Sequence, residues 1–425
     1  MAAADEFDVC IVGAGLWGSA AAKYCSARLG NSVCLIGPSE PTTKQDYDSR
    51  FVFGAHYDEG RAVGAISSTF EWGELARRSA GNFSNIEQET GIHFYSNVGS
   101  MWLTAQESSL SQKLLDVANQ TGIHATVLDQ EKLHQSYNFL STESIPLQKN
   151  TEIVGIIEKS GAGYLSPRKL VRAQQMLAHR QGCKIVDDIV NRLSCHDSQH
   201  SFDLITEGGK IIHAKKVLLC AGASLALEDF LPGGLQLDLA LKTQLVVLME
   251  IAQKDRDRLL DMPSLHVHEG EKDLGLDCYI LPPIQYPDGQ WYLKIGHGKV
   301  GEEEVTSKEQ LKAWYCGCGD ASTSDRLTQR LQDLFPGLNP ISLHTVTCVT
   351  ACTPTGHLYC DMVAPGLGVL VGGNGYGAKS SDEIGHMGAN MILKGEWDYD
   401  MPKDKFAVQL KSPEFTISPL KPQQK

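Results

Sequence analysis

Apolar residues occur in short runs along most of this chain, and glycine-rich or polar turns separate the runs. Residues 8–12 form the first run, which leads through a glycine turn into an alanine-rich segment at 19–24. A short apolar run followed by such a segment predicts a strand and then a helix. A second run at 32–36 completes a strand–helix–strand unit, which is typical of a parallel sheet covered by helices.

The middle of the chain mixes both patterns. Helical spacing of apolar residues predicts helices at 67–86, 106–122 and 170–180. Short apolar or alternating runs predict strands at 93–104, 183–186, 216–223, 239–250 and 278–301. The last of these runs contains Tyr286-Pro287-Asp288-Gly289, a composition typical of a hairpin turn. Residues 41–64 show neither spacing, and we expect them to form a loop.

The α/β pattern returns near the C-terminus. An apolar run at 368–373 predicts a strand, residues 374–378 form a glycine-rich turn, and residues 379–393 are expected to be helical. Two α/β segments therefore bracket a strand-rich middle, and 425 residues are enough for two domains. The pattern predicts an α/β (α+β) protein in which a parallel-sheet domain is interleaved with a domain built on a mixed or antiparallel sheet.

Gly13, Gly15 and Gly18 form a GxGxxG turn between the first strand and the first helix. In such a turn the first glycine permits a tight bend, the second lets a pyrophosphate approach, and the third lets the helix pack on the strand. The turn predicts a dinucleotide site, although a glycine-rich turn without a ligand remains the alternative. Gly37 stands where an acidic residue usually binds the ribose, so this motif alone leaves NAD and FAD open.

Charge and composition exclude some partners. The formal net charge of −13 argues against nucleic acid or an anionic membrane, because the summed field would repel both. No apolar run has the length of a membrane span, and the short acidic segment 1–7 is unlike a secretion signal or a transit peptide. We therefore expect a cytoplasmic protein with small-molecule partners.

The twelve cysteines are spread over the whole chain, and several lie within apolar strands. We expect most of them to be small buried hydrophobic residues and not a disulfide framework. Cys316, Cys318, Cys348 and Cys352 lack the paired CxxC spacing of a zinc site, so no metal is predicted.

Seven segments give a more specific indication than any single motif. They are GAGLWG (13–18), DSRFVFGAHYDEGR (48–61), GAGYLSPRKLVRA (161–173), KKVLLCAGAS (215–224), YLKIGH (292–297), TCVTACTPTGHLYCD (347–361) and GGNGYGAKSSDEIG (372–385). In this order and spacing the chain resembles the FAD-dependent amine oxidases of the monomeric sarcosine oxidase and pipecolate oxidase type, within the D-amino acid oxidase family. The resemblance implies a glutathione-reductase-like FAD-binding Rossmann domain and an interleaved substrate domain.

The resemblance also places domain boundaries. The expected FAD-binding domain comprises residues 1–75, 150–225 and 343–400. The expected substrate domain comprises residues 76–149 and 226–342. Residues 401–425 are expected to form a C-terminal tail.

The resemblance implies that FAD is attached covalently to Cys348. The family carries its flavin on a cysteine nine residues before a histidine, in a strand leading to an aspartate, and Cys348, His357 and Asp361 reproduce that spacing. A thiolate would act as the nucleophile toward the flavin 8α carbon. A buried strand cysteine beside noncovalent FAD is the alternative, and Cys352 is a poorer candidate.

Two lysines align with functional lysines of the family. Lys294 aligns with the lysine that promotes reaction with oxygen, where a fixed cation stabilises developing negative charge; an outward-facing strand lysine is the alternative. Lys379 aligns with the lysine that pairs with the substrate carboxylate, at a helix start whose partial positive charge would face flavin N1 and the C2 oxygen. A solvated side chain is the alternative for Lys379.

Other positions match the family or depart from it. Tyr279 matches an active-site tyrosine, whereas Tyr376 and Gly298 replace family histidines. Arg50 matches a flavin-side arginine, but the second, substrate-facing arginine falls at about Gly54, so a two-point carboxylate clamp is expected to be lost. The remaining residues expected at the cofactor are Val186, Gly222, Gly375 and Gly377.

Together these residues imply oxidation of a C–N bond in a secondary or N-alkyl amino acid, or a related amine, to an imine. FAD would be the cofactor, and O2 would be reduced to H2O2. A dehydrogenase of the same fold, a primary-amine or D-amino acid oxidase, and a noncatalytic flavoprotein remain as alternatives. The residues do not specify which amine is the substrate.

Overall fold

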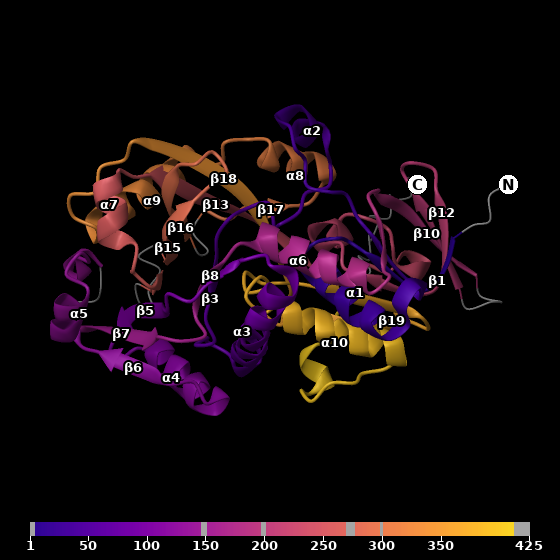
Figure 1. Ribbon diagram of the computed structural model, residues 1–425, viewed down its shortest axis with the longest axis horizontal. Coiled ribbons are helices and arrows are strands. Elements are labelled where there is room, and N and C mark those ends of the chain that lie inside the picture. The colour runs from indigo at the N-terminus through magenta and orange to yellow at the C-terminus, as the bar shows by residue number, and fades with distance from the viewer. Residues whose placement is uncertain (1–4, 146–150, 197–200, 269–276, 298–300, 412–425) are drawn as a thin grey trace, which may run out of the picture.

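The computed structural model describes residues 5–145, 151–196, 201–268, 277–297 and 301–411, and within these ranges the strands form three sheets. In the view of Figure 1, one large sheet and its helices lie on the right and the other large sheet lies on the left. The right-hand part holds segments from both ends of the chain, β1 (Asp5–Val12) and α10 (Ser381–Lys394). The chain therefore runs between the two parts more than once.

Within the described residues the first sheet has eight strands. Their order is β10 (Val190–His196), β11 (Ser201–Thr206), β12 (Ile211–Leu219), β1, β2 (Val33–Ile36) and β9 (Lys184–Val186), with β20 (Leu367–Val371) beside β12 and β19 (Tyr359–Ala364) beside β20. The strands β12, β1, β2 and β9 pair in parallel, and β20 is also parallel to β12. All residues of β2 and β20 are buried, as expected for a sheet covered on both faces.

Helices cover this sheet and bring distant segments together. The helix α1 (Leu16–Leu29) packs against both α6 (Pro167–Arg180) and α10, and α3 (Phe70–Thr90) packs against α6 and α10. These contacts join helices from the start, middle and end of the chain. The two α/β segments predicted from the sequence therefore form one layered unit.

The second sheet has nine strands among the described residues and is mixed. Their order is β17 (Glu304–Val305), β13 (Ala240–Glu250), β16 (Trp291–His297), β15 (Cys278–Gln285), β14 (Ser264–Val267), β5 (Ser100–Ala105), β7 (Ile153–Glu158) and β6 (Ala125–Leu128), with β18 (Ser342–Cys352) paired to β13. The pair of β14 with β5 is parallel and the other pairs are antiparallel. The helix α9 (Ala321–Leu334) covers β13 and β16.

A third, small sheet lies between the other two in Figure 1. It consists of β3 (Arg61–Val63), β8 (Gly163–Leu165) and β4 (Tyr95–Ser96). The remaining α-helices are α2 (Lys44–Ser49), α4 (Ser109–Thr121), α5 (Gln130–Ser136), α7 (Gln253–Leu259) and α8 (Lys308–Tyr315). Short 3-10 helices span Gly30–Ser32, Thr142–Ser144, Gly222–Ala226, Pro232–Gly234 and Lys403–Lys405.

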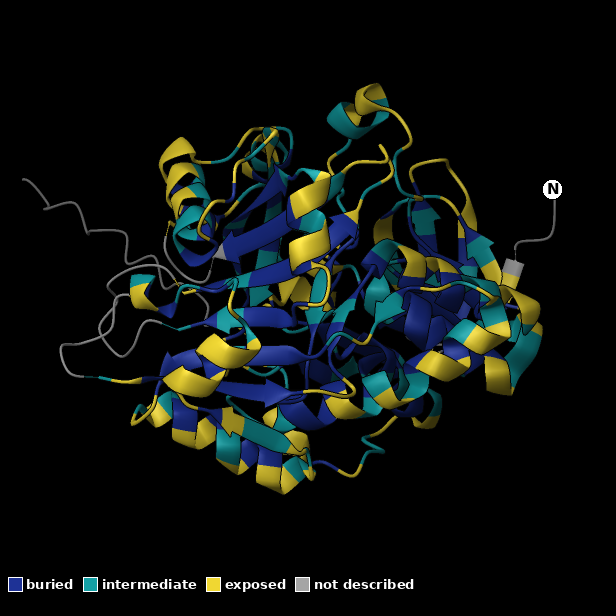
Figure 2. Cartoon of the chain, turned by 60° about the vertical axis from the view of Figure 1, so that its left-hand side comes forward, coloured by how far each residue is buried: buried dark blue, intermediate teal, exposed yellow. Residues whose placement is uncertain are grey.

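The distribution of buried residues follows this layering. Figure 2 shows dark blue strands in the interior and yellow outer faces on many helices. Within the described ranges, no helix combines the length and apolar character needed to cross a bilayer. The mixed α/β fold class predicted from the sequence is confirmed.

Three sequence expectations need correction. Residues 41–64 are not a plain loop, because they contain α2 and β3. The predicted boundaries give β7 and β18 to the cofactor domain, but both strands pair within the second sheet. Short apolar runs look alike in either sheet, so periodicity could not assign them. Within the predicted tail, residues 401–411 pack on the first sheet through Phe406, while residues 412–425 lie outside the described ranges.

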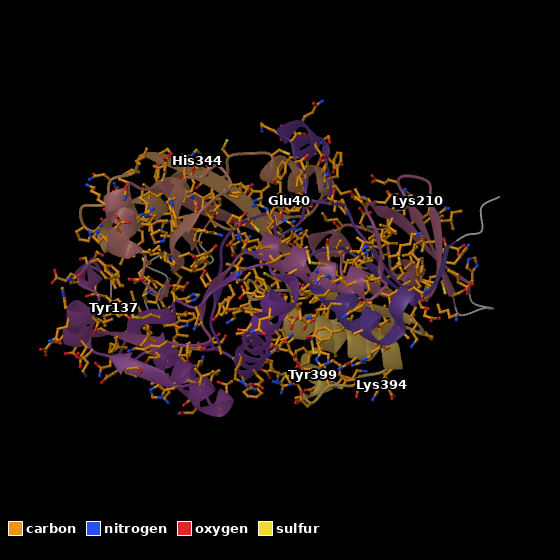
Figure 3. The ribbon with its side chains drawn as sticks, in the orientation of Figure 1. Glu40, Tyr137, Lys210, His344, Lys394 and Tyr399 are labelled. Carbon is orange, nitrogen blue, oxygen red and sulfur yellow. The ribbon has the colours of Figure 1, made fainter. Side chains whose placement is uncertain are left out.

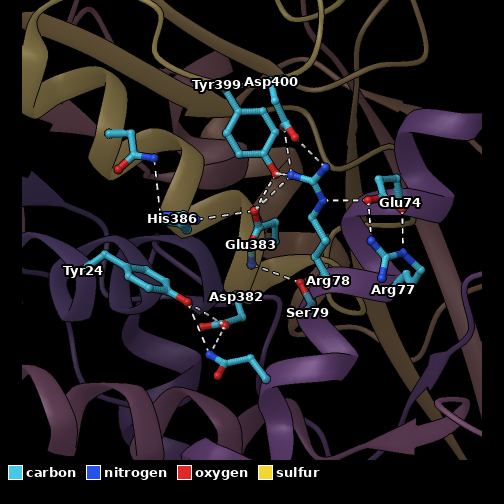
Figure 4. A network of polar contacts seen from close by, with 12 residues as sticks. Tyr24, Glu74, Arg77, Arg78, Ser79, Asp382, Glu383, His386, Tyr399 and Asp400 are labelled. Carbon is cyan, nitrogen blue, oxygen red and sulfur yellow. Dashed lines mark hydrogen bonds and ion pairs between the residues drawn. The ribbon is translucent and has the colours of Figure 1, made fainter. Parts of the chain in front are cut away.

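A polar network fixes the start of α10 against α3 (Figure 4). Arg78 of α3 contacts Glu74 at 2.7 Å and Asp400 at 2.8 Å, and Tyr399 donates a hydrogen bond of 2.5 Å to Glu383 of α10. On the neighbouring face, Asp382 is buried and pairs with Lys23. These contacts hold the first turn of α10, which directly follows the predicted glycine turn.

Candidate active site

A cavity of about 1450 Å³ is lined by residues of both large sheets. Its wall includes the first glycine turn, the ends of β2 and β12, residues 346–352 of β18 and the turn 372–379. Ordinary ligand pockets measure about 300–1000 Å³, so the cavity has room for a large cofactor and a second small molecule.

The first glycine turn lies at one end of the cavity. Gly13 and Gly15 line it, and Gly13 has a φ of 110°, which favours glycine. Gly15 is the N-cap of α1 and no side chain caps this helix, so its first amides remain available to an anion. Gly18 is not part of the wall: a Cβ there would collide with the carbonyl of Gly13, so Gly18 serves packing.

An acidic residue, Glu40, follows Gly37 three positions later. Glu40 lines the cavity and accepts hydrogen bonds from Arg168 at 2.6–2.8 Å. Figure 3 labels Glu40 near the middle of the molecule, between the two large parts. A half-buried carboxylate at the end of β2 can accept hydrogen bonds from ribose hydroxyls. The sequence motif missed this position because the acidic residue follows Pro38 in an irregular segment.

The other expected cofactor residues in this part divide into two groups. Gly222 lines the cavity directly after β12 and has a φ of 55°. Val186 instead lies in the apolar core, where its carbonyl accepts a hydrogen bond of 3.1 Å from the amide of Gly37. The cavity wall near Val186 is formed by residues 188–190.

The C-terminal glycine turn closes on the first one. Gly375 and Gly377 line the cavity, and the indole of Trp17 donates a hydrogen bond of 2.8 Å to the carbonyl of Gly377. A Cβ at Gly377 would approach the Trp17 ring to 2.9 Å, so glycine is required there by close approach. The two glycine-rich segments, more than 350 positions apart in the chain, thus form one continuous wall.

Lys379 lies on this wall, and its ammonium uses only part of its hydrogen-bonding capacity. Its Nζ donates a hydrogen bond of 2.9 Å to the carbonyl of Gly64 and lies 5.3 Å from the ring centroid of Tyr376. Burial lowers the pKa of Lys379 to about 8, and nearby Glu158 only partly opposes the shift. The helix α10 begins two residues later, at Ser381.

Lys294 is placed quite differently. Its side chain is 0% exposed and does not line the cavity, whereas Asp58 does. The Nζ of Lys294 contacts the carboxylate of Asp58 and the carbonyl of Gly60, the latter at 2.7 Å. Burial lowers the pKa of Lys294, while the carboxylate in contact stabilises its ammonium form. The sequence indicated a buried cation here but not its partner.

Asp58 has two further side-chain partners. Arg61 pairs with the same carboxylate, and Tyr286 donates a hydrogen bond of 2.8 Å to it. Arg61 lines the cavity, but Arg50 does not: Arg50 pairs with Asp46 and donates to a backbone carbonyl. The structure therefore brings Arg61, and not the predicted Arg50, to the wall, because β3 carries Arg61 between the two large sheets.

Cys348 lines the cavity from β18 with a free thiol. Its carbonyl accepts a hydrogen bond of 2.8 Å from the indole of Trp314, and burial together with Cys348 raises the pKa of Tyr315. His357 and Asp361, which completed the predicted spacing, lie away from the wall. His357 is 3.2 Å from Glu71 of α3, and Asp361 accepts a hydrogen bond from the amide of Val408.

The remaining predicted residues and two further aromatic side chains complete the wall. Tyr279 and Tyr376 line it as expected, and Gly298 lies outside the described residues. Trp102 and His266 also line it, and the buried Glu158 holds a segment behind it. Strand alternation alone could not show which of these side chains face the cavity, because this depends on register between strands far apart in sequence.

The comparisons with known proteins decide the family. A family model described as FAD dependent oxidoreductase (DAO) matches residues 8–391. The chain belongs to this family. It is 23% identical over 406 residues to "Probable sarcosine oxidase" of Arabidopsis thaliana, covering 92% of this chain and 89% of that protein. It is 21% identical over 405 residues to "Monomeric sarcosine oxidase" of Arthrobacter sp., covering 93% and 95%.

The fold agrees with this FAD-dependent family. The solved structure of NikD, described as an unusual amino acid oxidase essential for nikkomycin biosynthesis, superposes with a TM-score of 0.72. The match has 14% identity and covers 96% of this chain and 98% of that one. The wall of the cavity also fits FAD, because the turn at Gly13 and Gly15 leaves the uncapped amides of α1 open to a pyrophosphate.

Proposed function

We propose that this FAD-dependent oxidoreductase oxidises a C–N bond of a secondary or N-alkyl amino acid, or a related amine, to an imine. The proposal rests on the position of the Lys379 ammonium, which lines the cavity and donates one hydrogen bond, to the carbonyl of Gly64. A lysine has three donors, so two remain for a substrate carboxylate. The names of the similar proteins, sarcosine oxidase and amino acid oxidase, support the substrate class.

Different residues of the cavity wall would bind the cofactor and the substrate. The turn at Gly13 and Gly15 would hold the pyrophosphate of FAD, and Glu40 would accept from its ribose. Bound FAD would supply the two-electron acceptor; overall, amine and O2 would give imine and H2O2, and water would then hydrolyse the imine. Lys379 would orient the substrate through its carboxylate. Tyr279 and Tyr376 would cover the reacting carbon and exclude water, and burial raises the pKa of Tyr279 to about 12, which keeps its phenol protonated.

An anaerobic substrate screen tests the reaction. Purified protein is mixed without oxygen with matched pairs of primary and N-methyl amino acids, and the flavin absorbance is followed. We expect N-alkyl or cyclic secondary amino acids to bleach the flavin, and sarcosine to act poorly because only its carboxylate can orient it. Bleaching by primary amino acids alone would favour a primary-amine oxidase, and bleaching by no amine would contradict the proposal.

Covalent attachment through Cys348 is part of the proposal. The thiol lines the cavity, and a thiolate is the nucleophile that the link requires. After acid precipitation, the yellow colour should stay with the wild-type protein and with Cys352→Ala, and pass to the supernatant with Cys348→Ala. Cys352 lines the same cavity on the same strand and is therefore a matched control. Release of the colour from the wild type would show noncovalent binding.

One observation favours a second candidate, a flavin dehydrogenase. The charge of Lys294, expected to assist oxygen, is paired with Asp58 and sealed from the cavity. A paired cation stabilises new negative charge less than a free one, because the carboxylate opposes it. Anaerobically reduced protein mixed with air separates the two candidates: an oxidase returns to the oxidised spectrum at the rate of turnover, whereas a dehydrogenase requires an added electron acceptor.

A further inference from the structure

One rung of the second sheet forms the floor of the cavity. Aligned across six strands, its residues are Val346, Val246, Gly296, Tyr279, His266 and Trp102. All of them except Gly296 line the cavity. Because neighbouring residues on one rung share a face of the sheet, their side chains stand next to one another across the strands.

Gly296 leaves a gap in this rung, and Tyr279 leans into it. A Cβ on Gly296 would lie 2.6 Å from Cζ and 2.7 Å from the hydroxyl of Tyr279. The ring of Tyr279 therefore lies over β16. Its other neighbour on the rung, His266 of β14, is on the opposite side of β15. Tyr279 thus leans away from His266, and both side chains line the cavity, so the proposed space between them is a part of that cavity.

On the far side of that space, two rings are already stacked. His266 and Trp102 have centroids 4.5 Å apart and an angle of 16° between their planes. Among the ring contacts of the described residues, His266 pairs with Trp102 and not with Tyr279. Burial lowers the pKa of His266 to about 3, with the charge of Lys379 adding to the shift. The imidazole is therefore neutral near pH 7 and offers an uncharged aromatic face.

The stack is fixed relative to the carboxylate anchor by one backbone segment. Lys379 donates to the carbonyl of Gly64, and the Trp102 indole donates to the carbonyl of Ile66 at 3.2 Å. Glu158 accepts from the amides of Ala65 and Ile66 at 2.8 and 3.1 Å, which holds the segment in place. When a carboxylate binds Lys379, the rest of the same molecule therefore lies within reach of the stack of Trp102 and His266.

We propose that the space between His266 and Tyr279 is a subsite for a planar aromatic group of the substrate, which would continue the stack of Trp102 and His266. The substrate class is then an amino acid with an aromatic ring in its side chain or on its nitrogen. This inference rests on the proposed function through Lys379. It adds that the size and planarity of the ring group, and not the carboxylate alone, select the substrate.

Calorimetric binding of three unreactive carboxylates to the holoprotein tests the subsite: propionate, 3-phenylpropionate and 3-cyclohexylpropionate. We expect 3-phenylpropionate to bind at least tenfold more tightly than propionate, because an aromatic ring gains both burial and stacking. It should also bind several-fold more tightly than the cyclohexyl analogue, which is equally apolar but not planar. Equal affinities for phenyl and cyclohexyl compounds would overturn the proposal.

Variants locate the effect. Trp102→Leu should reduce the phenyl preference, the ratio of the 3-phenylpropionate and propionate binding constants, about threefold to tenfold, because stacked aromatic pairs contribute on that scale. Gly296→Ala should push the Tyr279 ring toward His266 and remove the phenyl preference without touching the indole. Val127→Ala, at the outer end of the same rung on β6 and not among the residues that line the cavity, is the matched control and should change the affinity for neither ligand. Retention of the phenyl preference in both Trp102→Leu and Gly296→Ala would contradict the subsite.

A last variant separates this inference from the proposed function. Lys379→Ala should weaken all three carboxylates by the same factor and preserve their ratios. If the affinity for propionate is the same in the wild type and in Lys379→Ala, Lys379 is not the carboxylate anchor and the proposed function is contradicted. If propionate depends on Lys379 but the three ligands bind equally, the anchor stands and the aromatic subsite is wrong.

Discussion

The two lysines at the cavity occupy opposite electrostatic settings. Lys294, on a central strand of the second sheet, is 0% exposed and shares the carboxylate of Asp58 with Arg61. Lys379, before α10, lies on the cavity wall and contacts one backbone carbonyl. The charge of Lys294 is balanced by the carboxylate in contact with it, whereas the ammonium of Lys379 keeps hydrogen-bond donors available to a ligand. The difference teaches that a lysine aligned with a functional position acts according to its partners.

The comparison also separates stability from binding. A charge that is buried with its partner belongs to the fold, because removal of one partner leaves the other unpaired in a low dielectric. A buried charge whose partner is a ligand adds little to the free energy of unfolding of the free protein and can lower it. Lys294 should therefore matter to folding as well as to chemistry, and Lys379 chiefly to the ligand.

The largest expected effect is on stability. Lys294→Met should lower the free energy of unfolding by about 3–5 kcal/mol, because it leaves the buried Asp58 without one of its two cations. Lys379→Met should change it by less than about 1 kcal/mol, since no carboxylate of the described residues contacts its ammonium. Urea unfolding followed by circular dichroism measures both.

The double variant is the control for this comparison. Lys294→Met combined with Asp58→Asn should recover much of the lost stability, because the orphaned charge is removed with its partner. Equal destabilisation by Lys294→Met and Lys379→Met would show that the contrast between the two lysines is wrong.

The second effect concerns oxygen. If the protein is an oxidase that uses Lys294, Lys294→Met should slow reoxidation about a hundredfold, the scale of losing one preorganised electrostatic group, while anaerobic flavin reduction changes much less. Asp58→Asn should have the opposite sign, because it frees the positive charge. Stopped-flow mixing with aerated buffer measures each rate. An equal fall of both half-reactions in Lys294→Met would assign the lysine a structural role.

Much of the fold was accessible from the sequence because its signals are local. The strand, turn and helix around Gly13 and Gly15 appear as predicted, and so does the hairpin after Tyr286. Each of these rests on residues adjacent in the chain, such as an apolar run or a turn dipeptide. Lys379 was named through the family resemblance, and the segment that carries this resemblance, GGNGYGAKSSDEIG, is also local.

The rest of the site depends on contacts between distant segments. Asp58 meets Lys294 because a small sheet carries residues 58–61 against β15 and β16, and no local pattern shows this. Trp102 and His266 share a rung only through the pairing of β5 with β14, more than 160 residues apart. Arg50 rests on the family resemblance alone, and Arg61 was not singled out because residues 41–64 show no regular spacing.

The third effect tests Lys379 as the proposed carboxylate anchor. Lys379→Ala should weaken a carboxylate ligand tenfold to a hundredfold, since one charge-assisted contact contributes about 1.5–3 kcal/mol. Lys113→Ala is the control, because Lys113 lines the same cavity from an exposed position on α4. Calorimetry with 3-phenylpropionate gives both constants. A similar loss in the two variants would mean that general positive charge, and not Lys379, attracts the carboxylate.

The smallest effect is the pH dependence that follows from the same lysine. Its pKa is lowered to about 8 by burial, so the ammonium is present below pH 8 and is lost as the pH rises through that value. The affinity for propionate should fall about twofold between pH 7 and 8 and about tenfold by pH 9, because only the charged form binds the carboxylate strongly. Propionate has no group of its own that titrates in this range, so the profile reports the protein. Lys379→Arg should flatten the profile up to pH 9, since a guanidinium stays charged there. A wild-type affinity that stays constant up to pH 9 would contradict the lowered pKa of Lys379. It would also contradict the claim that Lys379, unlike Lys294, is a buried cation without an acidic partner in contact.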